Sequence, residues 1–411
     1  MLRKRLSFSA VLFAVLAIAA GLALLQMGRR RMEAQSAQRA VKRPSAPACT
    51  PVQSRVEQLS AESSAPAPSP VVVRLNYAGA EGLVNALERD SLTDADVDSL
   101  LRIPGLCAMV DNVTRFFPEI GAPEFRQEIR RFAQTKKRGE YDGYFRFDEV
   151  WKARSAARAL IAAIQTNQGT IVSEMISQLE PYRPDTGRLV VTAYFVVGGV
   201  STGFAFENDP GSLYANVVAA DGDLNGVVLN LAHEAYHVMQ VRAQQQAGMD
   251  PRWLSSSTAV PIERLFGATL AEGTANYVAD PTRWTAPGSN MERARERYRR
   301  NAEPNRVAKN FALLDDMLMQ LQAGRTTWEK AYMEGFTSKN DDSFYFVGYE
   351  MTRAVEQYCG RECIGRLFKE PPVEFFRRYI ALYHQHSDVR GRFSQKTEAI
   401  IATWGNRPSS T

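Results

Sequence analysis

The chain has 411 residues, of which 45% are hydrophobic and 23% are charged, a composition typical of a folded protein with one large domain or two smaller ones. The net charge of +5 is unevenly distributed, because the first 43 residues carry +8 and the remainder therefore carries −3. A mildly acidic globular part argues against nucleic acid as a partner, and the basic N-terminus indicates a segment that lies beside a membrane.

Residues Leu6 to Gly28 form an uncharged run of 23 residues, long enough as a helix to cross a hydrocarbon core of about 30 Å. A secretory signal peptide is the alternative, with cleavage at the Ala17-Ile18-Ala19 triplet. Because the apolar run continues past that triplet, we favour an uncleaved signal anchor over residues 1–34. Basic residues flank the run on both sides, so the positive-inside rule does not decide its orientation. Since a lone N-terminal apolar segment usually serves export, we expect the folded part to be periplasmic, or secreted if the signal is cleaved.

Residues 35–70 are rich in proline, alanine and serine and lack apolar periodicity, which predicts an extended linker. Apolar residues at helical spacing follow, with Leu83, Leu87 and Leu92 on one stripe. This pattern predicts a helical N-terminal region over residues 71–185.

The pattern then changes to that of strands. Leu189 to Val197 is rich in valine, threonine and aromatic residues and ends at Gly198-Gly199, which predicts a strand. Shorter strands are predicted at 204–206 and 214–219, and helical patterns resume at Gly226. The expected fold class is therefore α+β, mostly helical with one small sheet before a key helix.

The four cysteines allow disulfides in an exported protein, and they are Cys49, Cys107, Cys359 and Cys363. Cys359 and Cys363 are four residues apart and are expected on one helix, where the geometry for a bridge is poor. Buried thiols are the alternative.

The segment Leu231 to Gln240 contains an HExxH motif, formed by His233, Glu234 and His237. Residues four apart project from one face of a helix, so both imidazoles can reach a single ion. Zinc lowers the pKa of a bound water to about 7, and a glutamate next to the first histidine can take the proton of that water. Val227, Val228, Leu231 and Val238 make this helix apolar, where unpaired histidines would be costly. We therefore expect His233 and His237 to bind one zinc ion per chain and Glu234 to act as the general base.

A catalytic zinc site needs a third protein ligand, and Glu272 is the best candidate. Pro261 fits the first turn of a helix through this residue, and Gly273 would allow that helix to lie close to the motif helix. Asn276, one turn further, could hydrogen-bond a ligand histidine. The alternatives for the third ligand are Glu263, His384 and His386.

HExxH followed by a Glu-Gly-x-Ala-x-Tyr segment at 272–277 resembles the gluzincins, a metallopeptidase clan with two histidines and one glutamate on zinc. More closely, the chain resembles uncharacterised bacterial zinc peptidases of that clan. Their Gly-Gly strand edge and Tyr-rich helix have counterparts here at 198–199 and 344–351. The resemblance implies a zincin-like catalytic core over residues 186–390, followed by a C-terminal tail over 391–411. The 34 residues between His237 and Glu272 exceed the spacing in thermolysin-like members.

Peptide cleavage creates an oxyanion that zinc and a hydroxyl donor can stabilise, and Tyr345 is favoured for this role over Tyr349. The strand that ends at Gly198-Gly199 could bind an extended peptide by strand addition, with a plain turn as the alternative.

These patterns together predict a zinc-dependent metallopeptidase that hydrolyses peptide or protein substrates by means of a zinc-activated water. The alternative is a catalytically silent zincin-like protein that binds peptides or acts as an interaction module in the cell envelope. Retention of Glu234 favours the enzyme, because a pure binding site needs no general base. Hydrolysis of a non-peptide bond is a third interpretation.

Overall fold

The structure, a computed structural model, describes residues 71–184, 187–249 and 260–405. The predicted signal anchor and linker fall within residues 1–70 and therefore lie outside the described residues. Within the described ranges, no helix combines the length and the apolar character that crossing a membrane requires.

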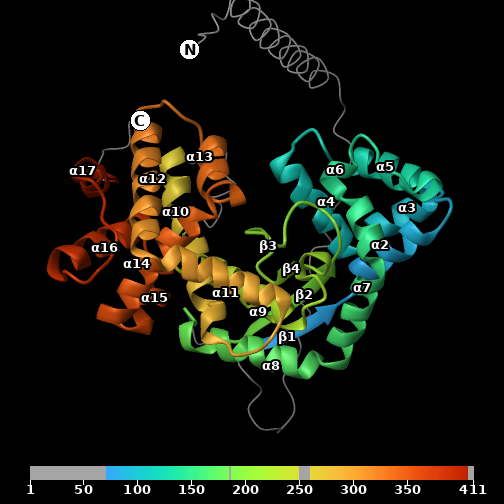
Figure 1. Ribbon diagram of the computed structural model, residues 1–411, viewed down its shortest axis with the longest axis horizontal. Helices are drawn as coiled ribbons and strands as arrows, with labels where there is room; N and C mark the ends of the chain where they lie inside the picture. Colours follow the sequence, from blue (N-terminus) through green and yellow to red (C-terminus); the bar gives the residue numbers. More distant parts are fainter. Residues whose placement is uncertain (1–70, 185–186, 250–259, 406–411) are drawn as a thin grey trace, which may run out of the picture.

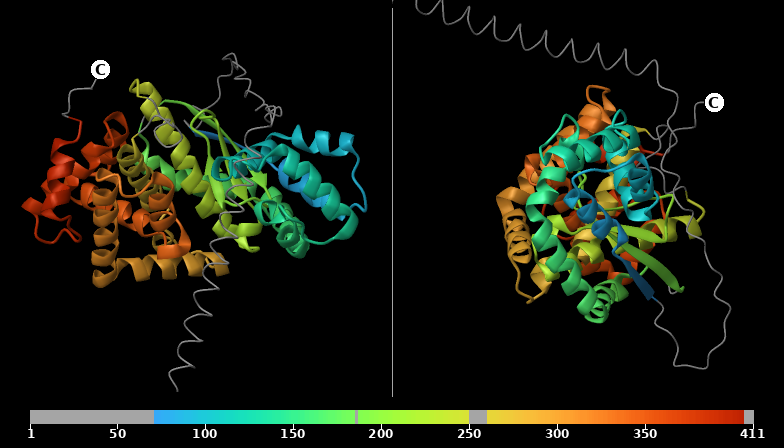
Figure 2. Two further views of the ribbon diagram at one scale, coloured as in Figure 1. Left: turned by 90° about the horizontal axis from the view of Figure 1, so that it is seen from above. Right: turned by 90° about the vertical axis from the view of Figure 1, so that its right-hand side faces the viewer.

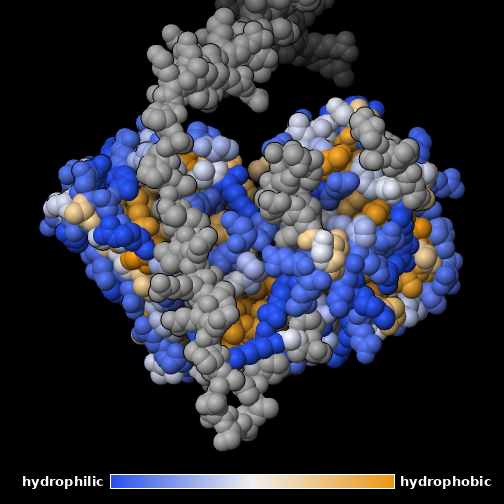
Figure 3. All heavy atoms as spheres, turned by 180° about the vertical axis from the view of Figure 1, so that it is seen from behind, coloured by the Kyte–Doolittle hydropathy of each residue, from blue (hydrophilic) through white to orange (hydrophobic). Residues whose placement is uncertain are grey.

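The molecule consists of two halves that lie side by side, with a small sheet and the long helix α9 (Leu224–Gln246) between them (Figures 1 and 2). The fold is mostly helical with one four-stranded sheet, as the α+β prediction requires. On the face opposite to that of Figure 1, hydrophilic residues predominate and apolar ones appear in separate patches (Figure 3).

The helices that cover the sheet in the N-terminal half follow the apolar periodicity of the sequence. They are α2 (Ala78–Glu88), α3 (Asp94–Leu101), α4 (Pro104–Phe116), α5 (Ala122–Thr135), α6 (Asp142–Phe145), α7 (Phe147–Thr166) and α8 (Gln168–Leu179), followed by the 3₁₀ turn η1 (Glu180–Tyr182). A capping box between Thr93 and Asp96 starts α3. Phe125, Phe132, Phe145 and Phe147 are fully buried where α5, α6 and α7 meet.

The sheet has the strand order β1-β2-β4-β3. Its strands are β1 (Val71–Asn76), β2 (Leu189–Val196), β3 (Gly203–Ala205) and β4 (Ser212–Asn216). β2 pairs in parallel with β1 on one side and with β4 on the other, whereas β3 pairs antiparallel to β4. The three later strands lie where the sequence predicts them, but β1 was not predicted. It comes from the valine-rich start of the region predicted to be helical.

β2 is thus a central strand, and this overturns the prediction that it binds a peptide by strand addition. Both of its edges already carry ladder hydrogen bonds, to β1 and to β4. Gly198 and Gly199 have positive φ angles of 84° and 72° and form the turn that follows the strand. Among the described strands, β3 is the one at the edge of the sheet beside α9.

Asp223 fixes the start of α9. It accepts hydrogen bonds at Oδ1 from the backbone N–H groups of Asn225 and Gly226, which satisfies donors of the first helical turn. Its Oδ2 accepts from the backbone N–H groups of Asn290 (2.9 Å) and Met291 (3.0 Å) in α11 (Ser289–Ala302). One buried carboxylate therefore joins the first turns of two helices that are distant in sequence.

The 3₁₀ turn η2 (Val218–Ala220) leads from β4 to α9. In the C-terminal half, the described residues form helices without strands. They are α10 (Pro261–Val278), α11, α12 (Pro304–Gln322), α13 (Trp328–Gly335), α14 (Ser343–Cys359), α15 (Arg361–Arg366), α16 (Val373–Gln385) and α17 (Gln395–Thr403), with the 3₁₀ turns η4 (Pro281–Arg283), η5 (Ser338–Asn340) and η6 (Leu367–Lys369). The segment predicted as a C-terminal tail contains α17, whose Ile401 is fully buried.

α10 and α14 cross at backbone contact, because glycines face each other there. A Cβ atom added at Gly273 would lie 2.3 Å from the carbonyl carbon of Gly348, and one added at Gly348 would lie 2.2 Å from the carbonyl oxygen of Thr269. Gly273 therefore brings α10 against α14. The prediction that it brings α10 close to the motif helix was wrong.

Cys359 and Cys363 form a disulfide, although the sequence argued against a bridge within one helix. The reason is that they do not share a helix. α14 ends at Cys359, Gly360 adopts a positive φ of 86°, and α15 begins at Arg361. The break redirects the chain between the two cysteines, whereas Cys107 is buried in α4.

We expect Gly348→Ala to lower the free energy of unfolding by about 1–3 kcal/mol, because its methyl group has no space between α14 and α10. Urea denaturation would measure the change. Gly169→Ala is the matched control, since Gly169 is exposed near the start of α8 and a Cβ there meets nothing within 4 Å. Equal stability of the two variants would contradict the close crossing.

Candidate metal centre

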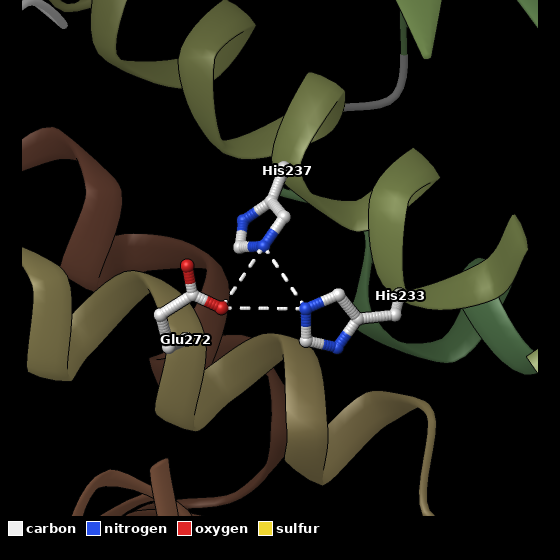
Figure 4. A group of neighbouring side chains, drawn as sticks. All are labelled: His233, His237 and Glu272. Atoms are coloured by element: carbon white, nitrogen blue, oxygen red, sulfur yellow. Dashed lines mark hydrogen bonds and ion pairs between the residues drawn. The ribbon is translucent and has the colours of Figure 1, made fainter. Parts of the chain in front are cut away.

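The two histidines of the HExxH motif lie on one face of α9, partly shielded from solvent. The rest of that helix is packed, with Val228, Leu231 and Tyr236 fully or almost fully buried. His233 Nε2 and His237 Nε2 are 3.1 Å apart and point toward the same place (Figure 4). This geometry follows from the four-residue spacing on a regular helix.

Glu272 reaches the same place from α10. Its Oε2 lies 3.3 Å from His233 Nε2 and 3.3 Å from His237 Nε2, which completes a nearly equilateral triangle of ligand-type atoms (Figure 4). α10 starts with Pro261 at its first position, as expected, and places Glu272 three turns later against α9. The structure thus brings together His233, His237 and Glu272.

The size of this triangle fits a tetrahedral metal ion. Three ligand atoms at zinc bond lengths of 2.0–2.1 Å and tetrahedral angles lie about 3.3 Å from one another. Glu272 Oε2 is also buried, and the polar atoms that the structure places around it are the two imidazole nitrogens of the triangle. A buried carboxylate needs positive charge beside it, and a bound metal ion would supply that charge.

Gln240, one turn after His237 on α9, orients that histidine. His237 Nδ1 and Gln240 Oε1 are 3.0 Å apart, and Gln240 Nε2 donates to the carbonyl oxygen of Ala271 and to Thr274 Oγ1, both at 2.9 Å. Because its amide nitrogen is committed to two acceptors on α10, the oxygen faces the imidazole and accepts a hydrogen bond from Nδ1–H. With the proton held at Nδ1, Nε2 of the neutral ring would be free to bind a metal ion at the centre of the triangle.

The sequence assigned this supporting role to Asn276, and that prediction was wrong. The partner of His237 Nδ1 is Gln240, and within the described residues the side chain of Asn276 bonds neither histidine. Gln240 could have been found from the sequence, because it lies three residues after His237 and so occupies the same face of α9.

Glu234 lies beside the triangle and beside the edge strand β3. It is 6% exposed, and a Cβ added at Gly203 would lie 2.6 Å from Glu234 Oε1. The absence of a side chain at Gly203 therefore makes room for this carboxylate. Asn230, one turn earlier on α9, donates from Nδ2 to the carbonyl oxygen of Thr202 and holds the start of β3 against α9.

Glu234, Glu272 and His237 have pKa values that burial and their charged neighbours shift. Burial raises the pKa of Glu234, an effect that the two imidazoles oppose and the charge of Glu272 reinforces. Burial also acts to raise the pKa of Glu272, but His237 and His233 outweigh it and hold that pKa well below its usual range. Burial acts to lower the pKa of His237, yet the two carboxylates and Gln240 raise it to about 9. In the metal-free protein, Glu272 is thus an anion beside a protonated His237.

The two candidate tyrosines of α14 differ in their surroundings. The ring of Tyr345 lies 6.4 Å from that of His233, and its hydroxyl has no hydrogen-bond partner within the described residues. Burial and the charge of Glu272 raise its pKa well above the usual value, so it remains a proton donor. Tyr349 instead donates to Asp280 Oδ2 at 2.7 Å. Of the two, Tyr345 is therefore the one with a hydroxyl available at the site.

The alternative ligands predicted from the sequence are not part of the cluster. Glu263 is exposed near the start of α10. His384 Nε2 lies 3.1 Å from Glu398 Oε2 on α17, and His386 stacks on Tyr358 with ring centroids 3.8 Å apart.

Sequence reasoning missed the residues on the far side of the site. Tyr332 on α13 is half-buried, and burial together with the charge of Glu272 raises its pKa. Arg115, at the end of α4, forms an ion pair with the buried Glu207 just after β3. No local motif marks these residues, because they reach the site only through the packing of the two halves.

Comparison with known families agrees with the motif and the geometry. Residues 97–388, most of the chain, match the family described as "Putative zinc dependent peptidase (DUF5700)". The chain belongs to this family. The predicted resemblance to uncharacterised zinc peptidases is thereby confirmed, and the family description supports zinc as the metal. No curated protein and no solved structure matches the chain.

We expect Gln240→Ala to weaken zinc binding about 10- to 100-fold, because His237 loses the partner that fixes its orientation and tautomer. Competition with a chromogenic chelator would measure the affinity. Gln245→Ala is the matched control, since Gln245 is exposed on the same helix. The same affinity in both variants would show that Gln240 does not support the site.

Proposed function

We propose that this protein is a zinc-dependent metallopeptidase of the gluzincin type, with His233, His237 and Glu272 as the ligands of one zinc ion. The observation that carries the proposal is the triangle of two imidazole nitrogens and one buried carboxylate oxygen with edges of 3.1–3.3 Å. Three protein ligands leave a fourth position open, which is typical of catalytic rather than structural zinc. Family membership supports a peptidase at the same coarse level.

Bound zinc would supply Lewis acidity toward a water molecule and toward the carbonyl oxygen of the substrate. Glu234 would accept the proton of the attacking water and return it to the leaving amine. Burial raises the pKa of Glu234, which is the direction that favours both steps, because proton transfer is most efficient when the pKa of the catalytic group lies near the working pH. Tyr345 would donate its hydroxyl proton in a hydrogen bond to the oxyanion.

An extended peptide would bind along β3. Among the described strands, β3 pairs on one side only, with β4, so its other edge can accept the backbone of a substrate. Gly203 in this strand is the residue that contacts Glu234, which places the peptide backbone beside the proposed general base. Strand addition is thus proposed at β3 and not at the central strand β2.

We also propose that the protein is anchored to a membrane by residues 6–28 with its catalytic part in the periplasm, or that it is secreted if that segment is cleaved. The uncharged run of 23 residues and the basic residues on either side of it support this location. Mass spectrometry of the mature N-terminus distinguishes the two forms, because a chain that begins at Ala20 would be the cleaved one.

We expect Glu234→Gln to retain zinc and to lose turnover about 10²- to 10⁴-fold, because the amide cannot accept the proton of the water. Zinc content by mass spectrometry and cleavage of a peptide library would be measured on the same preparations. Glu263→Gln, an exposed change on α10, serves as the control. Wild-type turnover in Glu234→Gln would rule out this mechanism and favour a silent peptide-binding protein.

Tyr345→Phe should lower kcat about 10²- to 10³-fold at unchanged zinc content, the usual loss for one oxyanion donor. Tyr349→Phe is the control, because its hydroxyl is committed to Asp280, so it should lose stability but not kcat. Steady-state kinetics on one peptide would separate them. A larger kcat loss in Tyr349→Phe would reverse the assignment.

A further inference from the structure

A row of aromatic rings leads from the candidate metal centre to the surface. Starting at the ring of His233, it passes through Tyr345, Phe336, Tyr332 and Phe116. Successive ring centroids are 6.4, 5.7, 5.6 and 5.8 Å apart. The first four rings belong to α9 and the C-terminal half, whereas Phe116 is the last residue of α4 in the N-terminal half. The row therefore runs from the candidate metal centre in the C-terminal half to the end of α4 in the N-terminal half.

The outer end of this row is unusually apolar for a surface. The side chain of Phe116 is 41% exposed, and that of Met333, which follows Tyr332 on α13, is 54% exposed. In the described part of the chain, only Val190 and Val260 are exposed large hydrophobic residues in addition to these two. Single exposed apolar residues are common, but these two both adjoin Tyr332, Phe116 by ring contact and Met333 as its neighbour on α13, which indicates a surface that contacts an apolar group.

The charged residue next to Phe116 in sequence is already paired. Arg115, next to Phe116, forms its ion pair with Glu207, and its guanidinium lies over the ring of Phe206 at 4.9 Å from the centroid. Its positive charge is thus matched by a neighbouring carboxylate. The hydroxyl of Tyr332 has no hydrogen-bond partner within the described residues, so it can meet the backbone of a bound peptide while the rings meet a side chain.

We infer that the row from Tyr345 to Phe116 forms the surface that binds a large apolar or aromatic side chain of the substrate next to the scissile bond, and that Phe116 determines this specificity. The inference rests on the proposed peptidase function. Substrates would be peptides with leucine, phenylalanine or residues of similar bulk at this position. A peptide with alanine there would leave the rings of Phe116 and Tyr332 exposed to water, and a charged residue would lose its hydration against them.

The test begins with a peptide library that the zinc-loaded protein cleaves, with the products identified by mass spectrometry. Matched peptides are then made that differ only in one residue on either side of the cleaved bond, which is alanine, leucine, phenylalanine, lysine or glutamate. We expect kcat/KM to be about 10- to 100-fold higher for leucine or phenylalanine than for alanine at one of the two positions.

Phe116→Ala should reduce this preference about tenfold, mainly through KM, because the apolar contact is lost while the groups at the bond remain. Val190→Ala is the matched control, since Val190 is equally apolar, 37% exposed and located on β2. A purely structural role of Phe116 would lower the stability and the rates for all peptides together, without changing their ratio.

The outcomes separate this inference from the function on which it rests. Cleavage with no preference for large apolar residues, or a preference that persists in Phe116→Ala, overturns the proposed role of the aromatic row in specificity and leaves the proposed peptidase function intact. A preference for lysine or glutamate overturns that role as well. A zinc-loaded protein that cleaves none of the peptides overturns both the proposed function and the role of the row.

Discussion

The structure depends on bringing two carboxylates and two imidazoles together inside a helical frame. Burial raises the pKa of Glu234 and acts in the same direction on Glu272, so keeping both anionic requires positive charge nearby. His237 supplies part of this charge in the metal-free protein, and the geometry leaves room for a cation to supply more. Helices α9 and α10 must therefore stay in register to within a few tenths of an ångström.

Each part of the frame serves that register in a different way. Asp223 ties the first turn of α9 to α11, and Gln240 bonds the middle of α9 to the backbone of α10. The glycine contact at Gly273 and Gly348 then seats α10 on α14, the helix that also carries Tyr345. The proposed ligands, general base and hydroxyl donor thus come from three helices, of which α10 is bonded to α9 and packed on α14. A hydrogen bond between two helices tolerates small shifts of those helices, whereas a backbone contact between glycines does not.

Much of this was predictable from the sequence because the decisive information is local. The spacing of His233 and His237 fixes their relative position on any regular helix, and Pro261 marks where α10 begins. The valine, threonine and aromatic residues of the segment from Leu189 to Val197 were enough to predict strand β2. What could not be predicted depends on partners distant in the chain. Gly273 signals a close approach but not to which helix.

Distant partners also decide the strand order of the sheet and the aromatic row beside the site, and neither could be predicted from the sequence. Nothing in residues 71–76 indicates that they pair with β2. The sequence therefore allowed β2 to be an edge strand, whereas it is central in the sheet. Tyr332 and Phe116 carry no motif at all, and they meet only because α13 and α4 face each other across the two halves. Residue type predicted which groups could do chemistry, whereas topology decided which of them share a site.

The parallel pairing of β1 with β2 has a consequence for how the chain folds during synthesis. Val71 pairs with Leu189, about 120 residues later, so β1 leaves the ribosome long before its partner exists. Closing so long a loop costs conformational entropy before any contact compensates it, and such non-local pairing slows folding. Until β2 emerges, β1 is an exposed apolar strand without a neighbour, a state prone to aggregation. Chaperone protection of the nascent chain would matter most during that interval.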